Sequence, residues 1–227
     1  MRKHLWCIGG AAALATTLWC WPGDAADAAT SPAKARSVLD ALDAAPATQP
    51  PASAGVTENF SRGLDGWRAT VGPEFPGAQV SLAVEPGQGP DGGPAMRLEG
   101  YFGKGGGYVG AIHNFPTPVP LKKLRFLIRP QGTAWVTIRL GDANGSWHQI
   151  RVKFRGANLD WQEIALDGFT PGKIGEECEY GTWGGTPENH GWTGHVRSLQ
   201  FLMDASSFKV PGTAHGAFSI CDVRLLP

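Results

Sequence analysis

Short runs in which apolar and polar residues alternate recur along the chain from Val56 onward. Gly, Pro, Asn and Asp separate these runs, and no window repeats its apolar residues with a helical period. Alternation with a period of two is typical of strands that bury one face. We expect strands at about residues 56–60, 66–71, 79–85, 95–102, 107–114, 121–129, 134–141, 146–154, 161–166, 196–203 and 216–226. The pattern predicts an all-β fold, either a two-sheet antiparallel sandwich or a barrel.

The runs at 134–141 and 146–154 can be divided into two faces. The inward side chains are Val136, Ile138, Leu140, Ile150, Val152 and Phe154. The outward side chains are Trp135, Thr137, Arg139, Trp147, Gln149, Arg151 and Lys153. An Asn144-Gly145 pair separates the runs and is a turn signal, so the two strands are expected to form a hairpin. Period two then places the outward set on one side of a sheet.

The outward face suggests a ligand-binding surface. Arg and Gln offer several hydrogen-bond donors that can grip hydroxyl or carboxylate groups, and flat aromatic rings can cover the C–H face of a sugar. The candidate ligand-binding residues are therefore Trp135, Arg139, Trp147, Gln149 and Arg151. Two alternatives stay open: an ordinary solvated sheet face is also polar, and another segment could cover the two tryptophans as part of the core.

The N-terminal segment differs from the rest of the chain. Arg2, Lys3 and His4 precede an apolar run that ends near Trp21, and a small-residue site follows at residues 26–28. This order predicts a signal peptide over 1–28 and a secreted or periplasmic protein. The alternative is an uncleaved membrane anchor, because the apolar run is nearly long enough to span a bilayer.

Composition divides the remaining chain into a linker and one domain. Residues 29–54 are rich in Ala, Pro, Ser and Thr, which indicates a disordered linker, and residues 55–227 form the expected ligand-binding domain. The whole chain has 20 Lys+Arg and 20 Asp+Glu, so no basic field exists to bind nucleic acid. We expect a monomer with no membrane span after signal cleavage. The whole sequence has nine tryptophans, of which at least half are expected in the core, and the others are candidate sugar platforms.

Two of the four cysteines lie in the expected signal peptide, which leaves Cys178 and Cys221 in the mature chain. In an oxidising compartment such a pair favours a disulfide. A bridge over that span would stabilise the fold by roughly 4 kcal/mol in the chain-entropy model. The alternative is two unpaired buried thiols.

Five stretches resemble, in the same order, motifs of the galactose-binding-like jelly rolls. The stretches are Asn59 to Trp67, Ala95 to Leu98, Leu121 to Arg129, Asp160 to Ile164 and Gly216 to Leu226. Many carbohydrate-binding modules of secreted glycosidase-associated proteins share that fold. The resemblance covers nearly all of residues 56–227, and it implies a two-sheet jelly roll that binds an oligosaccharide or polysaccharide without catalysis.

A second resemblance concerns the stretch from Thr182 to Trp192. It is similar to a Gly-Gly and Trp-containing loop of jelly-roll modules attached to bacterial glycosidases, although residues 188–190 replace the usual acidic-Gly pair. The resemblance implies that this loop walls one end of the ligand face. The residues that it adds to the candidate site are Trp183, Glu188, Asn189 and Trp192.

The same family commonly holds a structural Ca²⁺ between its first and last strands. Asp222 matches the last-strand acid of the family, whereas Ser61 stands at the position of the other acid and Glu58 lies nearby. The resemblance therefore implies a Ca²⁺ site with Glu58 and Asp222 as ligands and with carbonyl groups of the 90–93 loop completing the six to eight oxygens. The alternative is that both are ordinary surface acids.

Catalytic motifs are weak in this sequence. It contains no phosphate-binding loop, no H-E-x-x-H pair and no G-x-S-x-G turn, and its histidines lack metal-ligand spacing. Glu176, Glu177 and Glu179 cluster in a Gly-rich stretch, where a solvated turn explains them better than paired catalytic acids. The alternatives to a binding module are a β-sandwich glycan-active enzyme, such as a lyase or glucanase, and an envelope structural or interaction domain.

Overall fold

The computed structural model describes residues 55–154, 160–167, 169, 178–183, 191–208 and 214–227. Within these residues the structure is all β, apart from one 3-10 turn, η2 (Ala205–Ser207). None of the described segments is a helix with the length and apolar character needed to cross a membrane.

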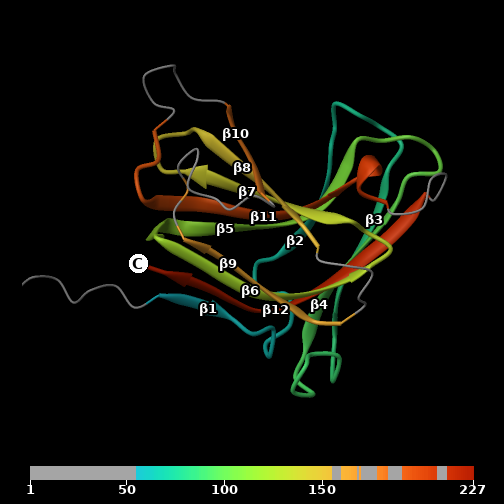
Figure 1. Cartoon of the computed structure of the whole chain (residues 1–227), viewed down its shortest axis with the longest axis horizontal. Helices are drawn as coiled ribbons and strands as arrows, with labels where there is room; N and C mark the ends of the chain where they lie inside the picture. Colours follow the sequence, from blue (N-terminus) through green and yellow to red (C-terminus); the bar gives the residue numbers. More distant parts are fainter. Residues whose placement is uncertain (1–54, 155–159, 168, 170–177, 184–190, 209–213) are drawn as a thin grey trace, which may run out of the picture. The chain divides into compact units, whose positions relative to one another are not determined.

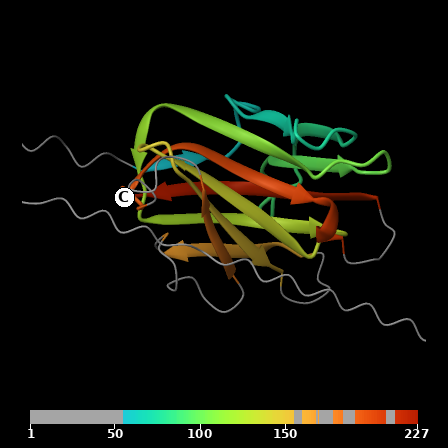
Figure 2. The same cartoon turned by 90° about the horizontal axis from the view of Figure 1, so that it is seen from above.

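Two antiparallel sheets form a sandwich, which confirms the predicted fold class (Figure 1). Sheet A contains β1 (Val56–Glu58), β3 (Gln79–Glu85), β4 (Ala95–Tyr101), β6 (Lys123–Gln131), β9 (Gln162–Asp167) and β12 (His215–Leu226). Sheet B contains β2 (Arg68–Val71), β5 (Tyr108–Pro120), β7 (Trp135–Asp142), β8 (Trp147–Lys153), β10 (Cys178–Trp183) and β11 (His195–Asp204). The order across sheet A is β3-β4-β12-β6-β9, with β1 paired to β12, and across sheet B it is β10-β8-β7-β11-β5-β2. Figure 2 shows β2 and β3 on the opposite side of the molecule from β10.

Aromatic side chains from both sheets meet in the core. Phe201 of β11 stacks on Trp67 at 5.6 Å between ring centroids and meets Phe126 of β6 edge-on at 4.9 Å. Strand β6 alternates buried and half-buried residues along its length, as a strand does when one face packs on a second sheet. Because the alternation is strict, the residues between the core positions must point to the outside of the sandwich.

The hairpin between β7 and β8 follows the sequence prediction. The amide of Asp142 donates to the carbonyl of Ser146 at 2.8 Å, and Gly145 adopts a φ of 90°. A three-residue loop of this kind needs one left-handed residue at its end, which glycine supplies without steric cost. The buried Asp142 carboxylate also accepts a hydrogen bond from the Thr193 amide at 2.7 Å, which ties the hairpin to the segment before β11.

Strand β12 contains a β-bulge at Asp222. The register with β6 shifts between Cys221 and Arg224, and Asp222 has a φ of 52°. The extra residue explains why Ile220 and Val223, three positions apart, both point into the core. Asp is one of the few residues other than glycine that tolerates this backbone region.

The structure corrects the sequence prediction in one strand. Residues 178–183, which were interpreted as part of a Gly-rich acidic turn, form edge strand β10 paired with β8. Glu179 therefore belongs to a strand. The stretch combines Gly and Glu, which are both depleted in strands, and its pairing with β8 is a tertiary contact that local alternation does not reveal.

Removal of the Phe201 ring should strongly destabilise the sandwich core. The side chain has no exposed surface and packs between two aromatic rings. Phe201→Ala is expected to lower the free energy of unfolding by about 3–5 kcal/mol, measured by urea denaturation. Lys123→Ala, at the exposed start of β6, is the control and should change it by no more than about 0.5 kcal/mol. Equal effects of the two variants would contradict this assignment of the core.

Candidate functional site

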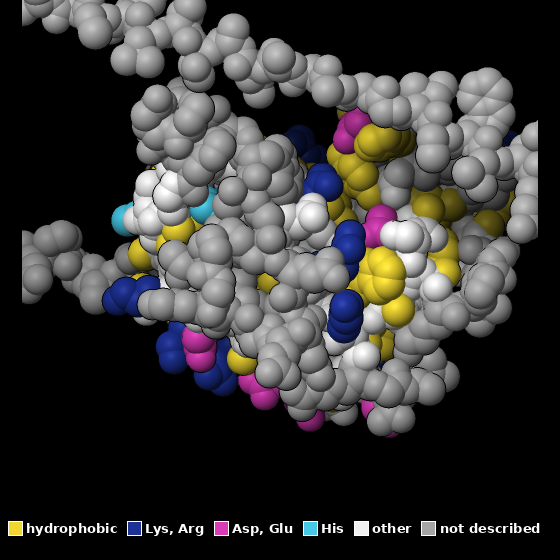
Figure 3. All heavy atoms as spheres, turned by 45° about the horizontal axis from the view of Figure 1, so that its top comes forward, with side chains coloured by type: hydrophobic (Ala, Val, Ile, Leu, Met, Phe, Trp, Pro, Cys, Tyr) yellow, Lys and Arg dark blue, Asp and Glu magenta, His cyan; other side chains and the backbone are white. Residues whose placement is uncertain are grey.

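The outer face of sheet B carries a hollow of about 340 Å³ near the beginnings of β5 and β7. Its lining combines guanidinium, amide, hydroxyl and carboxylate groups with apolar side chains. The lining residues are Phe75, Gly107, Tyr108, Thr137, Arg139, Gln149, Arg151, Leu202, Asp204, Ala205 and Ser206. Figure 3 views this side of the molecule and shows dark blue basic side chains beside yellow hydrophobic ones.

Strand register sets which side chains are neighbours on this face. Arg139 of β7 lies opposite Gln149 of β8, and Thr137 lies opposite Arg151. On the other side of β7, Gln200 and Leu202 of β11 lie opposite Arg139 and Thr137. The alternate residues of β7 and β8 are buried between the sheets, so the predicted outward set of Trp135, Arg139, Trp147, Gln149 and Arg151 shares the outer face.

Two neighbours among the described residues hold Arg139. Its Nε donates a 2.9 Å hydrogen bond to the Gln149 side-chain oxygen, and its guanidinium lies 4.5 Å from the centroid of the Tyr108 ring. A guanidinium over an aromatic face is attracted by the ring quadrupole. The two contacts fix the planar donor group of Arg139 in the hollow before any ligand arrives.

A second cluster joins Trp135, Arg151 and Asp204. The indole N–H of Trp135 donates to Asp204 at 3.0 Å, and the Arg151 guanidinium lies 5.1 Å from the Trp135 ring centroid. Arg151 also lies 4.0 Å from the Asp204 carboxylate. The three side chains therefore hold one another, and Asp204 offsets part of the positive charge of the face.

The Thr137 hydroxyl is a buried polar group in the floor of the hollow. The residue is only 4% exposed and lines the hollow, and its Oγ1 makes no hydrogen bond to any residue that the structure describes. A buried hydroxyl without a partner costs free energy, and a ligand hydroxyl would satisfy it. Thr137 is thus suited to receive a polar group at the floor of the hollow.

Trp147 lies on the same face outside the hollow. It is opposite Gly141 in the register of β7 and β8. A Cβ atom added at Gly141 would lie 3.3 Å from the indole, so the ring covers the backbone of that glycine. Trp135 and Trp147 are both half-buried, and neither is among the buried core residues that the structure describes.

Phe75, Tyr108 and Asp204 are among the residues of the hollow that sequence reasoning missed. Phe75 comes from the loop after β2 and is 54% exposed, so no strand alternation marked it. Tyr108 begins β5, where Gly107 and Gly110 interrupt the pattern of large side chains. The alternation of β11 could have indicated Asp204, because Gln200 and Leu202 precede it on the same face.

Trp192 lies elsewhere than predicted. Its ring packs at 4.9 Å from Phe169 and at 5.1 Å from the buried ring of His148, and it contacts the core. His148 follows the inward alternation of β8, so Trp192 lies on the core side of sheet B and not beside the hollow. Glu188, Asn189 and the side chain of Trp183 lie outside the described residues, although the register places Trp183 opposite Trp147.

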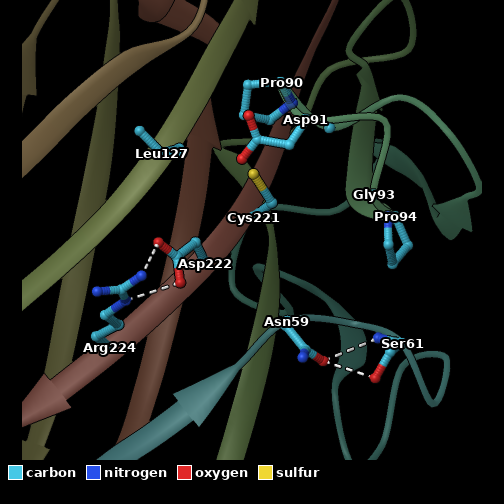
Figure 4. A pocket seen from close by; sticks show the side chains of 11 residues that line it. Asn59, Ser61, Pro90, Asp91, Gly93, Pro94, Leu127, Cys221, Asp222 and Arg224 are labelled. Atoms are coloured by element: carbon cyan, nitrogen blue, oxygen red, sulfur yellow. Dashed lines mark hydrogen bonds and ion pairs between the residues drawn. The ribbon is translucent and has the colours of Figure 1, made fainter.

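A second hollow, also of about 340 Å³, lies beside the bulge of β12 (Figure 4). Asp222 is held there by Arg224 through contacts of 2.8 and 2.7 Å, and the hydrogen bond to Asp222 raises the pKa of Arg224. Asn59 accepts hydrogen bonds from the amide and hydroxyl of Ser61. Figure 4 shows the Asp91 carboxylate close to the sulfur of Cys221.

Glu58 ends β1 and is not among the residues that line this hollow. Burial raises its pKa, and the nearest charges that act on it are those of His113, Asp65 and Arg62. It does not line the hollow beside Asp222, and the described residues contain no group of three His, Cys, Asp or Glu that could hold a metal. In the register of β1 and β12 Glu58 lies opposite Val223, which follows Asp222, and an ion at Asp222 would have to displace Arg224. A calcium requirement stays a prediction from the family resemblance.

The predicted disulfide is not formed. Cys221 is a free, buried cysteine on β12, which lies inside sheet A. Cys178 begins β10 at the edge of sheet B, and its side chain lies outside the described residues. The expected pair came from counting the cysteines that remain after processing, and such a count gives no information on their positions in the two sheets.

The raised pKa of Glu58 gives a pH-dependent stability that can be measured. The folded state favours the neutral Glu58 carboxyl. The contribution of this group to the free energy of unfolding is therefore complete below the ordinary pKa of 4.5 and is lost as the pH rises through the raised pKa. Glu58→Gln, which stays neutral, should be more stable than the native protein at pH 7 and should lose that advantage below about pH 4. Urea denaturation in the presence of a chelator measures the free energy of unfolding of both proteins at each pH. Glu74→Gln, an exposed site, is the control; a loss of stability in Glu58→Gln that appears only with Ca²⁺ would instead support Glu58 as a ligand.

Cys221 should be a poorly reactive thiol. Burial and the nearby Asp222 and Asp91 carboxylates raise its pKa from 9.0 to about 11. Because the thiolate is the nucleophile, the folded protein should alkylate at Cys221 at least about a hundred-fold more slowly than the unfolded chain. Timed alkylation followed by peptide mapping measures the alkylation rate at Cys221 separately from the other cysteines. Failure to alkylate Cys221 even in denaturant without reductant would show that the thiol is oxidised.

No protein-family model matches the chain, and no curated protein matches it in sequence. Solved structures do match it. A family 11 carbohydrate-binding module from Clostridium thermocellum, in complex with a β-1,3-1,4-mixed-linked tetrasaccharide, is 15% identical with a TM-score of 0.50, over 76% of this chain and 95% of that one. A family 11 module of a cellulosomal cellulase from the same organism is 16% identical with a TM-score of 0.48, over 76% and 94%. At this identity the likeness concerns the fold: the chain has the β-sandwich jelly-roll fold found in carbohydrate-binding modules.

Proposed function

We propose that this domain binds a glycan in the hollow on the outer face of sheet B. The observation that carries the proposal is the lining of that hollow, where Arg139, Gln149 and Thr137 offer hydrogen-bond groups beside the rings of Tyr108 and Phe75. Sugars present hydroxyl groups along the ring edge and C–H groups on the ring face, so they need both kinds of contact. The fold shared with carbohydrate-binding modules is consistent with this use.

Pre-organisation of the polar groups supports the same proposal. Arg139 is fixed by Gln149 and Tyr108, and Arg151 is fixed near Asp204 and Trp135. Side chains that are already ordered lose less conformational entropy when a ligand binds. Weak contacts to sugar hydroxyls can therefore contribute to affinity here, whereas mobile arginines would lose much of that gain.

The proposed activity is binding without catalysis. Asp204 is the one carboxylate among the described residues that line the hollow. Most glycosidases need two carboxyl groups that flank the scissile bond. Asp204 also accepts the Trp135 hydrogen bond and lies near Arg151, which suits a role in holding the site. Cleavage of a bound glycan during prolonged incubation would contradict this part of the proposal.

We also propose that the protein works outside the cytoplasm. The support is the N-terminal sequence pattern of positive residues, apolar run and small-residue site, which lies in residues 1–54, outside the described part. A mature N-terminus near Ala28 would agree with export.

A glycan array tests the proposal, run on the purified protein with Ca²⁺ and with a chelator. Trp135→Ala should weaken binding to the glycans that the array identifies by about five-fold or more, because it removes a ring and the partner of Asp204 and Arg151. The matched control is Trp161→Ala: Arg129 lies 5.2 Å from the Trp161 ring, nearly the same arrangement as Arg151 over Trp135, but in contact with sheet A.

Binding titrations and thermal melts on both variants separate a lost site from a lost fold. The expected result is weaker binding in Trp135→Ala alone, with both variants folded. Absence of binding to every glycan on the array, or equal loss in the two variants, would overturn the proposed site.

A further inference from the structure

We propose that the glycan is a linear oligosaccharide that lies along β7 and β8, with aromatic side chains at both ends of its path. The inference rests on the proposed function and concerns the shape and length of the ligand. It follows from the positions of the aromatic side chains on the outer face of sheet B, which lie at the two ends of the strands, with hydrogen-bonding groups between them.

The first end of the path is formed by Phe75 and Tyr108. The Phe75 ring packs against Gly107, where an added Cβ would lie 2.7 Å from the ring. Phe75 is nevertheless 54% exposed, so it keeps apolar surface available at the hollow. Together with η2, which supplies Ala205 and Ser206 to the lining, these rings close the hollow at the end of the sheet where β7 begins and β8 ends.

The middle of the path is polar. Thr137 and Arg139 are successive outer-face positions of β7, Gln149 of β8 lies opposite Arg139, and all three line the hollow. Their groups donate and accept hydrogen bonds, as a row of sugar hydroxyls requires. Arg139 and Gln149 are bonded to each other, so this row is continuous across β7 and β8.

The other end of the path is Trp147. Lys153, at the end of β8, lies opposite Trp135, and Trp147 is six positions earlier on the same strand. Six residues of an antiparallel strand span about 20 Å. Trp147 does not line the hollow, so a ligand confined to the hollow cannot reach it. A linear chain that leaves the hollow along β8 passes over the indole that covers Gly141.

Alternation explains why the path follows the strands. The outer-face positions between the two ends hold Arg151, Gln149, Thr137 and Arg139, whose backbone neighbours are buried. On one side of Trp147 the neighbouring positions are Gly141 of β7 and Ser198 of β11, which offer no large side chain, and on the other side Trp183 of β10 lies opposite it. At the level of Trp147, contacts that suit sugars therefore do not continue across β7 and β11.

A ladder of linear oligosaccharides tests the inference, from disaccharides to octasaccharides of β-1,4-linked glucose, xylose, mannose and galactose. Affinity of the full chain, measured by calorimetry, should rise with length until the ligand spans the path and then level off. Trp147→Ala should weaken binding of the longest members by about five- to ten-fold and leave the shortest unchanged. Trp147→Phe, which keeps a flat ring, should restore most of the dependence on length, and it guards against a variant that does not fold. Trp161→Ala, in contact with sheet A, is the matched control.

Each outcome decides between the two proposals. Equal affinity for short and long members, or equal weakening of both by Trp147→Ala, overturns the linear path and leaves glycan binding intact. Binding to branched or terminal glycans on the array, with no binding to any ladder, also overturns the path alone. Binding to neither overturns the proposed function together with the path.

Discussion

The two-residue period of the strands in sheet B connects the core to the candidate binding face. Each residue that is buried between the sheets fixes the direction of the next, so Ile138 and Ile150 determine that Arg139 and Arg151 point outward. A slip of one residue in this pairing would bury two guanidinium groups and expose the aliphatic core, at a large cost in free energy. The positions of the binding groups are thus held by the burial of their neighbours, with the contacts among Arg139, Gln149 and Tyr108 refining them.

Sheet architecture alone does not decide which face binds. Each sheet has a pair in which an arginine lies over a tryptophan ring. The pairs are Arg151 over Trp135 on sheet B and Arg129 over Trp161 at sheet A. The two arginines differ in the surrounding surface. Arg151 lines a hollow closed by a loop and a 3-10 turn, whereas neither Arg129 nor Trp161 lines either of the two hollows described above. The candidate function therefore comes from the loops and small residues around the sheet, in keeping with the general separation of fold and function.

Local alternation was sufficient to predict most strands, the β7–β8 hairpin and the shared face of Arg139, Gln149 and Arg151, because period two is a property of neighbouring residues. The same reasoning could not find Phe75, which reaches the site from a loop, or β10, whose strand state depends on pairing with β8. Trp192 was assigned from a motif, and a motif does not state which side of a sheet its tryptophan faces. The disulfide was inferred from the number of cysteines left after processing, and that number says nothing about the distance between Cys178 and Cys221. Side-chain partners such as Arg224 for Asp222 also lie beyond a strand pattern, since they depend on a bulge in β12.

The place of β12 in sheet A has a consequence for how the domain assembles. This strand is the last of the domain in sequence, yet it is hydrogen-bonded to β1, β4 and β6, which come much earlier. Until it is synthesised, β4 and β6 have no strand between them, and each presents an unpaired edge that invites association with other chains. The contacts that complete sheet A span much of the domain sequence, so their loop-closure entropy must be overcome late and folding should be slow. An exported chain of this topology would benefit from remaining unfolded until all of it has crossed the membrane, because partial folding would expose those edges.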